Sequence, residues 1–222
     1  MFLLVLALPA AASAVAPQTF DFDQSTALSL ILPAGNVTVR PGESLSVTVT
    51  PTDWSDRCRL ETGEDAAARV EIRQPRKAPV CAADVAVTVP RGMRLRVDLE
   101  AGDVTLGDTD AAIDLLIGTG DIALEGPAGS VFTDIEVGSL TGRAAGGLLA
   151  TLHEGDVSVS WAGLPTGDIH VLTHHGDVKL GLPADVLLTG ADRQPASFRA
   201  VLSQEKTVQA DAQRGAVVVT PG

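Results

Sequence analysis

Apolar and polar residues alternate along most of this chain, and the alternating segments recur around a glycine. The recurring glycines are Gly102, Gly120, Gly138, Gly155 and Gly176, so the successive steps are 18, 18, 17 and 21 residues. A fixed period of about 20 residues is typical of solenoids, in which each repeat buries its apolar face against its neighbours. The pattern therefore predicts a stack of short repeats rather than one of the common enzyme folds.

Within one repeat the apolar residues stand at every second position. Ile113, Leu115 and Ile117 precede Gly120, and Ile122 follows it. This period of two indicates a strand with one buried face. Each repeat is therefore predicted to contain a strand, a bend, a second strand and a looser turn, with successive repeats stacked in parallel.

The bend between the two strands is assigned to a glycine followed by a small polar residue. Glycine tolerates a positive φ, and aspartate accepts hydrogen bonds from nearby backbone amides. The template also fits two outlying segments, around Gly35 and Gly215. The predicted bend residues are Gly35, Gly102, Asp103, Gly120, Asp121, Gly138, Gly155, Asp156, Gly176, Asp177 and Gly215.

The repeats bracket residues 17–222, which we predict to form a single all-β domain of the solenoid class (a β-helix or β-roll) with rungs of about 18–21 residues. The register is lost between Gly35 and Gly102, and an irregular insertion is expected at about 51–80. The segment 191–196 contains Arg, Gln and Pro, so it is predicted to be a loop.

The first 16 residues have the form of a signal peptide. An apolar stretch is followed by small residues, with possible cleavage near Ala14 or Ala16. The stretch is too short to span a bilayer, and no transmembrane anchor is expected. The chain is therefore predicted to be exported, to the periplasm or to the cell surface.

The chain has two cysteines, Cys58 and Cys81, which flank much of the insertion. An isolated pair in an exported protein usually forms a structural disulfide. The alternative, a redox-active pair, lacks the close Cys-x-x-Cys spacing.

The net charge of −12 argues against nucleic acid as a partner, because phosphates require a basic face. It also argues against passive docking on anionic lipid.

Stacking places Asp103 beside Asp121 and Asp156 beside Asp177, which suggests either bound Ca²⁺ or turns in which the carboxylates accept backbone hydrogen bonds. The turn interpretation requires no metal, and the calcium-binding nonapeptide repeat is absent from the sequence.

Four polar residues form a candidate transition-metal site. Superposing Gly155 on Gly176 aligns His153 with His174 and Glu154 with His175, which would bring them to one end of adjacent rungs. Imidazole and carboxylate groups are suitable ligands for Zn²⁺. The alternative is a set of exposed polar residues at a rung edge, and His170 lies on the same outward face as His174.

Catalysis is not expected, and no cofactor is predicted. The outward carboxylates Asp98, Asp114, Asp134 and Glu136 resemble the acid and base pairs of polysaccharide-cleaving enzymes. However, Phe132 is the only outward-facing aromatic residue that we place beside them. The sequence contains no recognisable nucleophile–base arrangement or phosphate-binding loop.

Four phrases carry a resemblance to a known family. They are Val85–Pro90, Met93–Val97, Ala101–Val104 and the later run His175–Pro183, which contains Gly-Asp-Val and ends in Leu-Pro. Together they resemble the putative-adhesin β-strand-repeat family of exported bacterial proteins, also described as auto-transporter-adhesin-like or head-GIN-like. The resemblance covers residues 20–220 and implies a right-handed, mostly parallel β-solenoid at the cell envelope, with no catalytic residues.

Three functions remain open from the sequence. The first is an adhesin-like binding module that presents flat sheet faces to an envelope component or to a surface glycan or protein. The second is a structural protein that self-associates through solenoid ends, with 216–220 as one exposed edge strand. The third, which the sequence favours least, is a polysaccharide-active enzyme.

Overall fold

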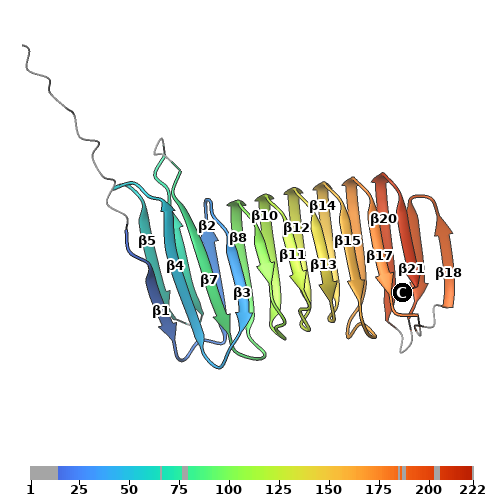
Figure 1. The fold of residues 1–222 in the computed structure, drawn as a ribbon, viewed down its shortest axis with the longest axis horizontal. Helices are drawn as coiled ribbons and strands as arrows, with labels where there is room; N and C mark the ends of the chain where they lie inside the picture. The colour runs from blue at the N-terminus through green and yellow to red at the C-terminus, as the bar shows by residue number, and fades with distance from the viewer. Residues whose placement is uncertain are drawn as a thin grey trace, which may run out of the picture.

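A computed structural model describes residues 15–65, 67–76, 80–184, 186, 189–202 and 206–221. The predicted signal peptide lies almost entirely outside these residues. The described residues form an all-β structure without helices, built from two large, mostly parallel sheets in an elongated stack (Figure 1). None of the described segments is a helix long and apolar enough to cross a membrane.

The first sheet has ten strands, and its central strands are parallel. In spatial order they are β1 (Gln18–Phe22), β4 (Leu45–Asp53), β7 (Ala82–Val89), β3 (Val37–Pro41), β9 (Val104–Leu106), β11 (Ile122–Glu125), β13 (Leu140–Ala144), β15 (Val157–Trp161), β17 (Val178–Leu182) and β21 (Val217–Pro221).

The second sheet has eleven strands. In spatial order they are β18 (Thr189–Gln194), β19 (Ser197–Val201), β20 (Thr207–Arg214), β16 (Ile169–His175), β14 (Leu148–Glu154), β12 (Val131–Val137), β10 (Ala112–Thr119), β8 (Arg94–Ala101), β2 (Ala27–Leu32), β6 (Ala68–Arg73) and β5 (Arg59–Glu64).

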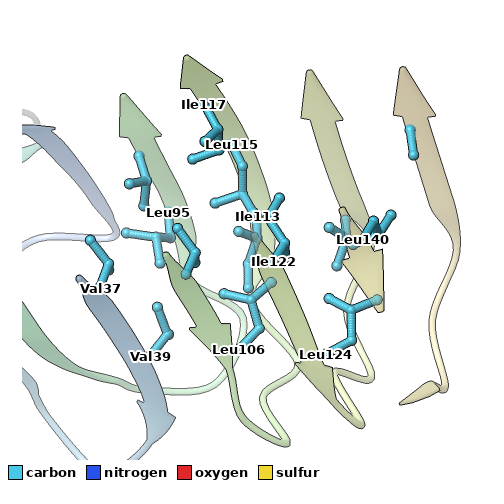
Figure 2. Close-up of a cluster of buried hydrophobic side chains, with 14 of the residues drawn as sticks. Val37, Val39, Leu95, Leu106, Ile113, Leu115, Ile117, Ile122, Leu124 and Leu140 are labelled. Carbon is cyan, nitrogen blue, oxygen red and sulfur yellow. The ribbon is translucent and has the colours of Figure 1, made fainter. Parts of the chain in front are cut away.

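Along the repeats the chain alternates between the two sheets. Strand β10 of the second sheet is followed by β11 of the first, and the next repeat continues with β12 and β13. Equivalent residues pair in register, as Ile113 does with Val131 and Ile122 with Leu140. The inward aliphatic side chains of both sheets fill the space between them (Figure 2). Burial of these apolar columns is the main force that holds the stack together.

A column of glycines runs along the bends of the stack. Gly102, Gly120, Gly138, Gly155 and Gly176 all have a positive φ. A Cβ added to Gly138 would lie 1.8 Å from the carbonyl oxygen of Gly120, and the same contact recurs from one rung to the next. Glycine is required here because each bend combines a left-handed backbone with close stacking on the preceding bend.

The polar residues that follow these glycines form a hydrogen-bonded ladder. The Asp103 carboxylate accepts a hydrogen bond from the backbone N–H of Asp121 at 2.9 Å, and Asp121 in turn accepts one from the N–H of Ser139 at 2.7 Å. Asp156 accepts from the N–H of Asp177 at 2.7 Å. Each carboxylate therefore links its own rung to the next, whereas the sequence suggested only bonds within one turn.

The order of the first rungs differs from the order in the chain. Strands β2 and β3 pair directly with β8 and β9, whose paired residues come 67 positions later, so Gly35 joins the glycine column next to Gly102. The intervening residues fold outward on the far side of β2 and β3. There, β6 and β7 extend the parallel stack, and β1, β4 and β5 add antiparallel strands at its end. The predicted insertion thus contains two strands, β5 and β6.

The prediction of a loop at 191–196 is wrong for most of the segment. Residues up to Gln194 belong to β18, which pairs antiparallel with β19, and β19 pairs antiparallel with β20. This hairpin covers the end of the second sheet. An end strand that pairs on one side needs fewer apolar residues than a central strand, so its sequence resembles that of a loop.

Candidate binding face

The outer face of the eleven-stranded sheet exposes three large apolar side chains close together. Phe132 is 47% exposed, Leu149 is 45% exposed and Leu116 is 41% exposed. Phe132 on β12 is the cross-strand partner of Leu149 on β14, and Leu116 lies on the neighbouring strand β10. We call these three residues the apolar patch. Their outward direction follows from strand parity, because residues on either side of each are buried.

Two hollows flank the ring of Phe132. One, of about 300 Å³, is bordered by Arg94, Arg96, Asp114 and the ring itself. The other, of about 410 Å³, lies between the ring and Gly147, Leu149, Asp168 and His170. The small residues Ala112 and Gly147 leave room beside the ring. Phe132 is therefore accessible from both directions along the stack.

An acidic groove of about 400 Å³ adjoins the apolar patch. Its floor is β10, where Leu116 and then Gly118 face outward. Leu116 has Asp98 of β8 and Asp134 of β12 as its cross-strand partners. The register of the same strands places Gly118 between Glu100 and Glu136. Two pairs of carboxylates thus form the walls of the groove, and His153 lies at one side.

Three of the four outward carboxylates predicted from the sequence, Asp98, Asp134 and Glu136, are brought together in this groove, and Glu100 joins them. Asp114 lies outside it and forms an ion pair with Arg96 at 3.2 Å. Phe132 was predicted from the sequence to face outward, whereas Leu116 and Leu149 were not predicted. The signal was present, because each belongs to a run of adjacent apolar residues that breaks the alternation.

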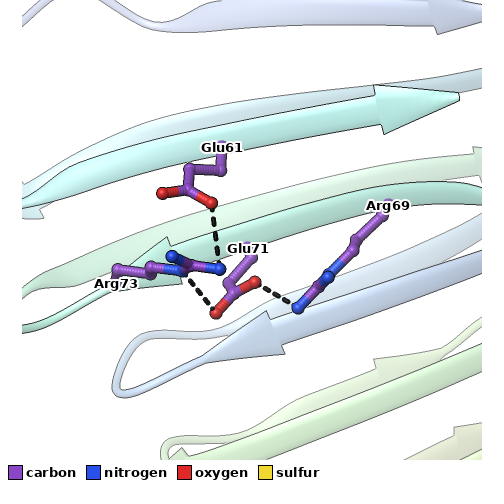
Figure 3. A network of polar contacts seen from close by, with 4 residues as sticks. All are labelled: Glu61, Arg69, Glu71 and Arg73. Carbon is purple, nitrogen blue, oxygen red and sulfur yellow. Dashed lines mark hydrogen bonds and ion pairs between the residues drawn. The ribbon is translucent and has the colours of Figure 1, made fainter.

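Basic side chains at the far end of the same sheet are already paired with carboxylates (Figure 3). Arg73 contacts Glu61 at 3.1 Å and Glu71 at 2.9 Å, and Glu71 also pairs with Arg69. The hydrogen bond to Glu71 raises the pKa of Arg73 above its ordinary value. These charges lie on β5 and β6, and charged side chains on an end strand discourage further pairing. Arg73 also lines a hollow with Asp98 and Glu100, so these paired charges lie on the outer side of the β8 wall of the acidic groove.

The histidines predicted as metal ligands are only partly brought together. The rings of His153 and His174 stack with centroids 4.9 Å apart and planes 14° from parallel. Glu154 pairs with His175 in the backbone register, and His170 contacts the Thr207 hydroxyl at 2.9 Å. In the described part of the chain, no group of three or more His, Cys, Asp and Glu side chains is placed to hold a metal. Metal binding by His153, Glu154, His174 and His175 stays a prediction.

The predicted disulfide is confirmed. Cys58 and Cys81 are bonded and buried, with their Cα atoms 5.7 Å apart. They join the start of β5 to the start of β7, so the bond connects the two sheets at one end of the stack.

Trp161 is buried near the core edge, and its Nε1 donates a hydrogen bond to the Gly146 carbonyl oxygen at 3.0 Å.

Asp168, which lines the second hollow, stabilises the fold in a pH-dependent way. Its carboxylate accepts hydrogen bonds from the Thr207 backbone N–H at 2.7 Å and from the Thr207 hydroxyl at 3.1 Å. The backbone hydrogen bond lowers the pKa of Asp168 below its ordinary value. A lowered folded-state pKa contributes stability above the unfolded-state value of about 3.9, and this contribution is lost as the pH falls through the folded-state pKa.

We therefore expect Asp168→Asn to unfold at a lower urea concentration than the wild type at about pH 7. The difference should narrow as the pH falls below about 4, because the wild-type carboxylate then becomes protonated. The difference is measured from the urea unfolding midpoints of the two proteins at about pH 7 and again below about pH 4. A difference in midpoint of equal size under both conditions would contradict the prediction.

Neither a known family model nor a curated protein matches the sequence. Among solved structures, a putative cell adhesion protein from Clostridium sporogenes is 13% identical, with a TM-score of 0.45, covering 93% of this chain and 99% of the other. A putative adhesin from Bacteroides fragilis is 10% identical, with a TM-score of 0.37 and coverage of 91% and 95%. A putative adhesin from Parabacteroides merdae is also 10% identical, with a TM-score of 0.26 and coverage of 92% and 95%. All three likenesses are distant.

Proposed function

We propose that this chain is an exported, non-catalytic, adhesin-like binding module. In this proposal residues 17–222 form one right-handed β-solenoid domain, and the outer face of its eleven-stranded sheet contacts a component of the cell envelope or a surface glycan or protein. The observation that carries the proposal is the apolar patch, centred on Phe132, a residue that is 47% exposed.

The patch supports binding because it breaks the pattern of its own strands. In these rungs the buried positions hold aliphatic residues, apart from Thr133, and most outward positions hold polar or small ones. Three large apolar side chains at neighbouring outward positions gain nothing from the solenoid core. Clustered apolar side chains on a surface are typical of interaction sites, since contact with a partner removes them from water.

Export is supported by the disulfide together with the leader-like first 16 residues. Disulfides persist in oxidising compartments and are rare in the cytosol. The Cys58–Cys81 bond thus fits a periplasmic or surface location.

The alternative, self-assembly through a solenoid end, has less support than the face. Strand β21 is at the edge of the ten-stranded sheet, where the sequence placed an exposed edge. However, the Val217 N–H already donates a hydrogen bond to the Pro195 carbonyl oxygen at 3.0 Å. The turn of the β18–β19 hairpin thus occupies the beginning of this edge, which leaves a short segment for pairing with a second copy.

The proposal predicts that Phe132→Ser weakens binding without unfolding the protein. The purified mature chain should be retained saturably by an envelope fraction of its source cells. The variant should bind roughly 10-fold to 30-fold more weakly, because a central aromatic contact is commonly worth about 2 kcal/mol. Retention is measured by titrating the fraction against immobilised protein.

Val218→Ser is the matched control, because Val218 is 46% exposed on the other sheet. It should bind like the wild type. Equal weakening by both variants, or no retention of the wild type by any envelope fraction, would refute binding through this face.

A further inference from the structure

We infer that the partner of this face is an extended basic peptide segment of another protein, in which one apolar residue is followed by basic residues at alternate positions. The inference rests on the proposed function and adds the chemistry of the occupant. It is carried by the position of the acidic groove, which adjoins the apolar patch at Leu116 and follows strand β10.

The groove follows the course of β10. Along this strand the outward side of the sheet presents first Phe132 beside Asp114, then Leu116 between Asp98 and Asp134, then Gly118 between Glu100 and Glu136. Successive outward positions are about 6.6 Å apart, and the carboxylate walls are two strand spacings apart, about 9.6 Å. An extended chain has the same 6.6 Å repeat on one face, so it can follow the groove in step.

The order of the contacts sets the order of residues in the partner. An apolar side chain above Asp114 packs against Phe132 on the neighbouring strand, and the next side chain on the same face lies above Leu116 between the first pair of carboxylates. The third lies above Gly118 in the groove, where a long basic residue can reach Glu100 and Glu136. The segment therefore has the pattern apolar-x-basic-x-basic.

The charge of the groove selects a cation. The described residues that line it include four carboxylates and no Lys or Arg. Arg96, on the same strand as Asp98, is already paired with Asp114 at 3.2 Å. Carboxylates facing one another repel, and a basic side chain between them relieves this repulsion while forming charge-assisted hydrogen bonds. Complementary charge also directs the approach of the partner.

The same charge disfavours anionic partners, such as nucleic acid or acidic lipid, at this face. A lone metal ion would leave the apolar patch uncovered. A peptide with both an apolar and a basic part covers both halves of the surface.

The test uses synthetic peptides of about a dozen residues, long enough to span one strand. The first, called the Lys peptide, repeats the sequence Leu-Thr-Lys-Thr-Lys-Thr. The second has the same sequence with Glu in place of every Lys. Fluorescence anisotropy with the full mature chain should show the Lys peptide binding at least about 10-fold more tightly at low salt. The advantage should shrink at about 0.15 M salt, where exposed charges are screened.

The double variant Asp134→Asn, Glu136→Gln should weaken binding of the Lys peptide roughly 10-fold, since it removes one wall of charge and keeps the shape. Glu125→Gln is the control, because Glu125 is an exposed carboxylate on β11 of the other sheet. It should bind like the wild type, and thermal melting should show both variants folded.

Equal affinity for the two peptides, or an unchanged affinity in the double variant, would overturn the inference. The proposed function is tested separately by the envelope fraction. One outcome separates the two claims: the fraction binds the wild type but not the Phe132→Ser variant, and a neutral oligosaccharide displaces it whereas the Lys peptide does not. In that case the face is a glycan site, and only the basic-peptide inference fails. If the fraction is not retained at all, the proposed function fails as well.

Discussion

The variant Gly138→Ala is expected to lose roughly 2–6 kcal/mol of folding free energy. Its φ of +151° is costly for any residue with a side chain, by about 1–3 kcal/mol. The added Cβ would also lie 1.8 Å from the Gly120 carbonyl oxygen, and such overpacking costs about 1–3 kcal/mol or more. Since a domain is typically stable by only about 5–15 kcal/mol, much of the protein should be unfolded or poorly soluble. Urea unfolding followed by circular dichroism measures the loss.

Gly163→Ala is the matched control. A Cβ at Gly163 meets no atom within 4 Å, and its φ is not in the left-handed range. Its unfolding midpoint should stay close to that of the wild type. If Gly138→Ala were equally well tolerated, the glycine column would not be a requirement of stacking.

Removal of the disulfide by the double variant Cys58→Ser, Cys81→Ser is expected to cost about 3 kcal/mol. The bond spans a sequence separation of 23 residues, and in the chain-entropy model a crosslink over a loop of this size restricts the unfolded chain by about that amount. The loop contains β5 and β6, which lie at one end of the stack, and β5 is the end strand, paired only with β6. We therefore expect this end to loosen first, as seen by hydrogen exchange at β5 and β6.

A reductant provides the control for this experiment. It should lower the denaturation midpoint of the wild type to that of the double variant and leave the double variant unchanged. Identical midpoints for oxidised and reduced wild type would show that stacking alone holds this end.

The central repeats were predictable from sequence because their interactions are regular. From Arg94 to Leu182 each strand pairs with its equivalent in the next repeat, so a periodic sequence produces a periodic structure. The direction of Phe132 also followed from parity along one strand. The disulfide could be predicted because the chain offers only one possible pair.

The two ends of the stack were less predictable. The pairing of β2 with β8 brings together residues about 67 positions apart, and nothing in either strand's sequence selects that partner over a nearer one. At the other end, β18 is polar because it pairs on one side only, so periodicity did not reveal it. The ends depend on which surfaces remain uncovered after the central repeats have stacked.

The candidate face required the tertiary structure for a similar reason. Alternation shows that Leu116, Asp134 and Glu100 face outward, but it does not show that they share one groove with Asp98 and Glu136. That grouping depends on the register between β8, β10 and β12, where a shift by one residue would turn each side chain to the opposite face.

The sequence by itself determined the kind of structure: an all-β stack of short repeats, bends at glycines, and a buried aliphatic column, because these follow from local periodicity and from the backbone freedom of glycine. Only the tertiary structure decided the order of the first rungs, the antiparallel ends and the position of the acidic groove beside Phe132. The physical reason is that local patterns set which way a side chain points, whereas its neighbours across strands are set by pairing between segments distant in the chain.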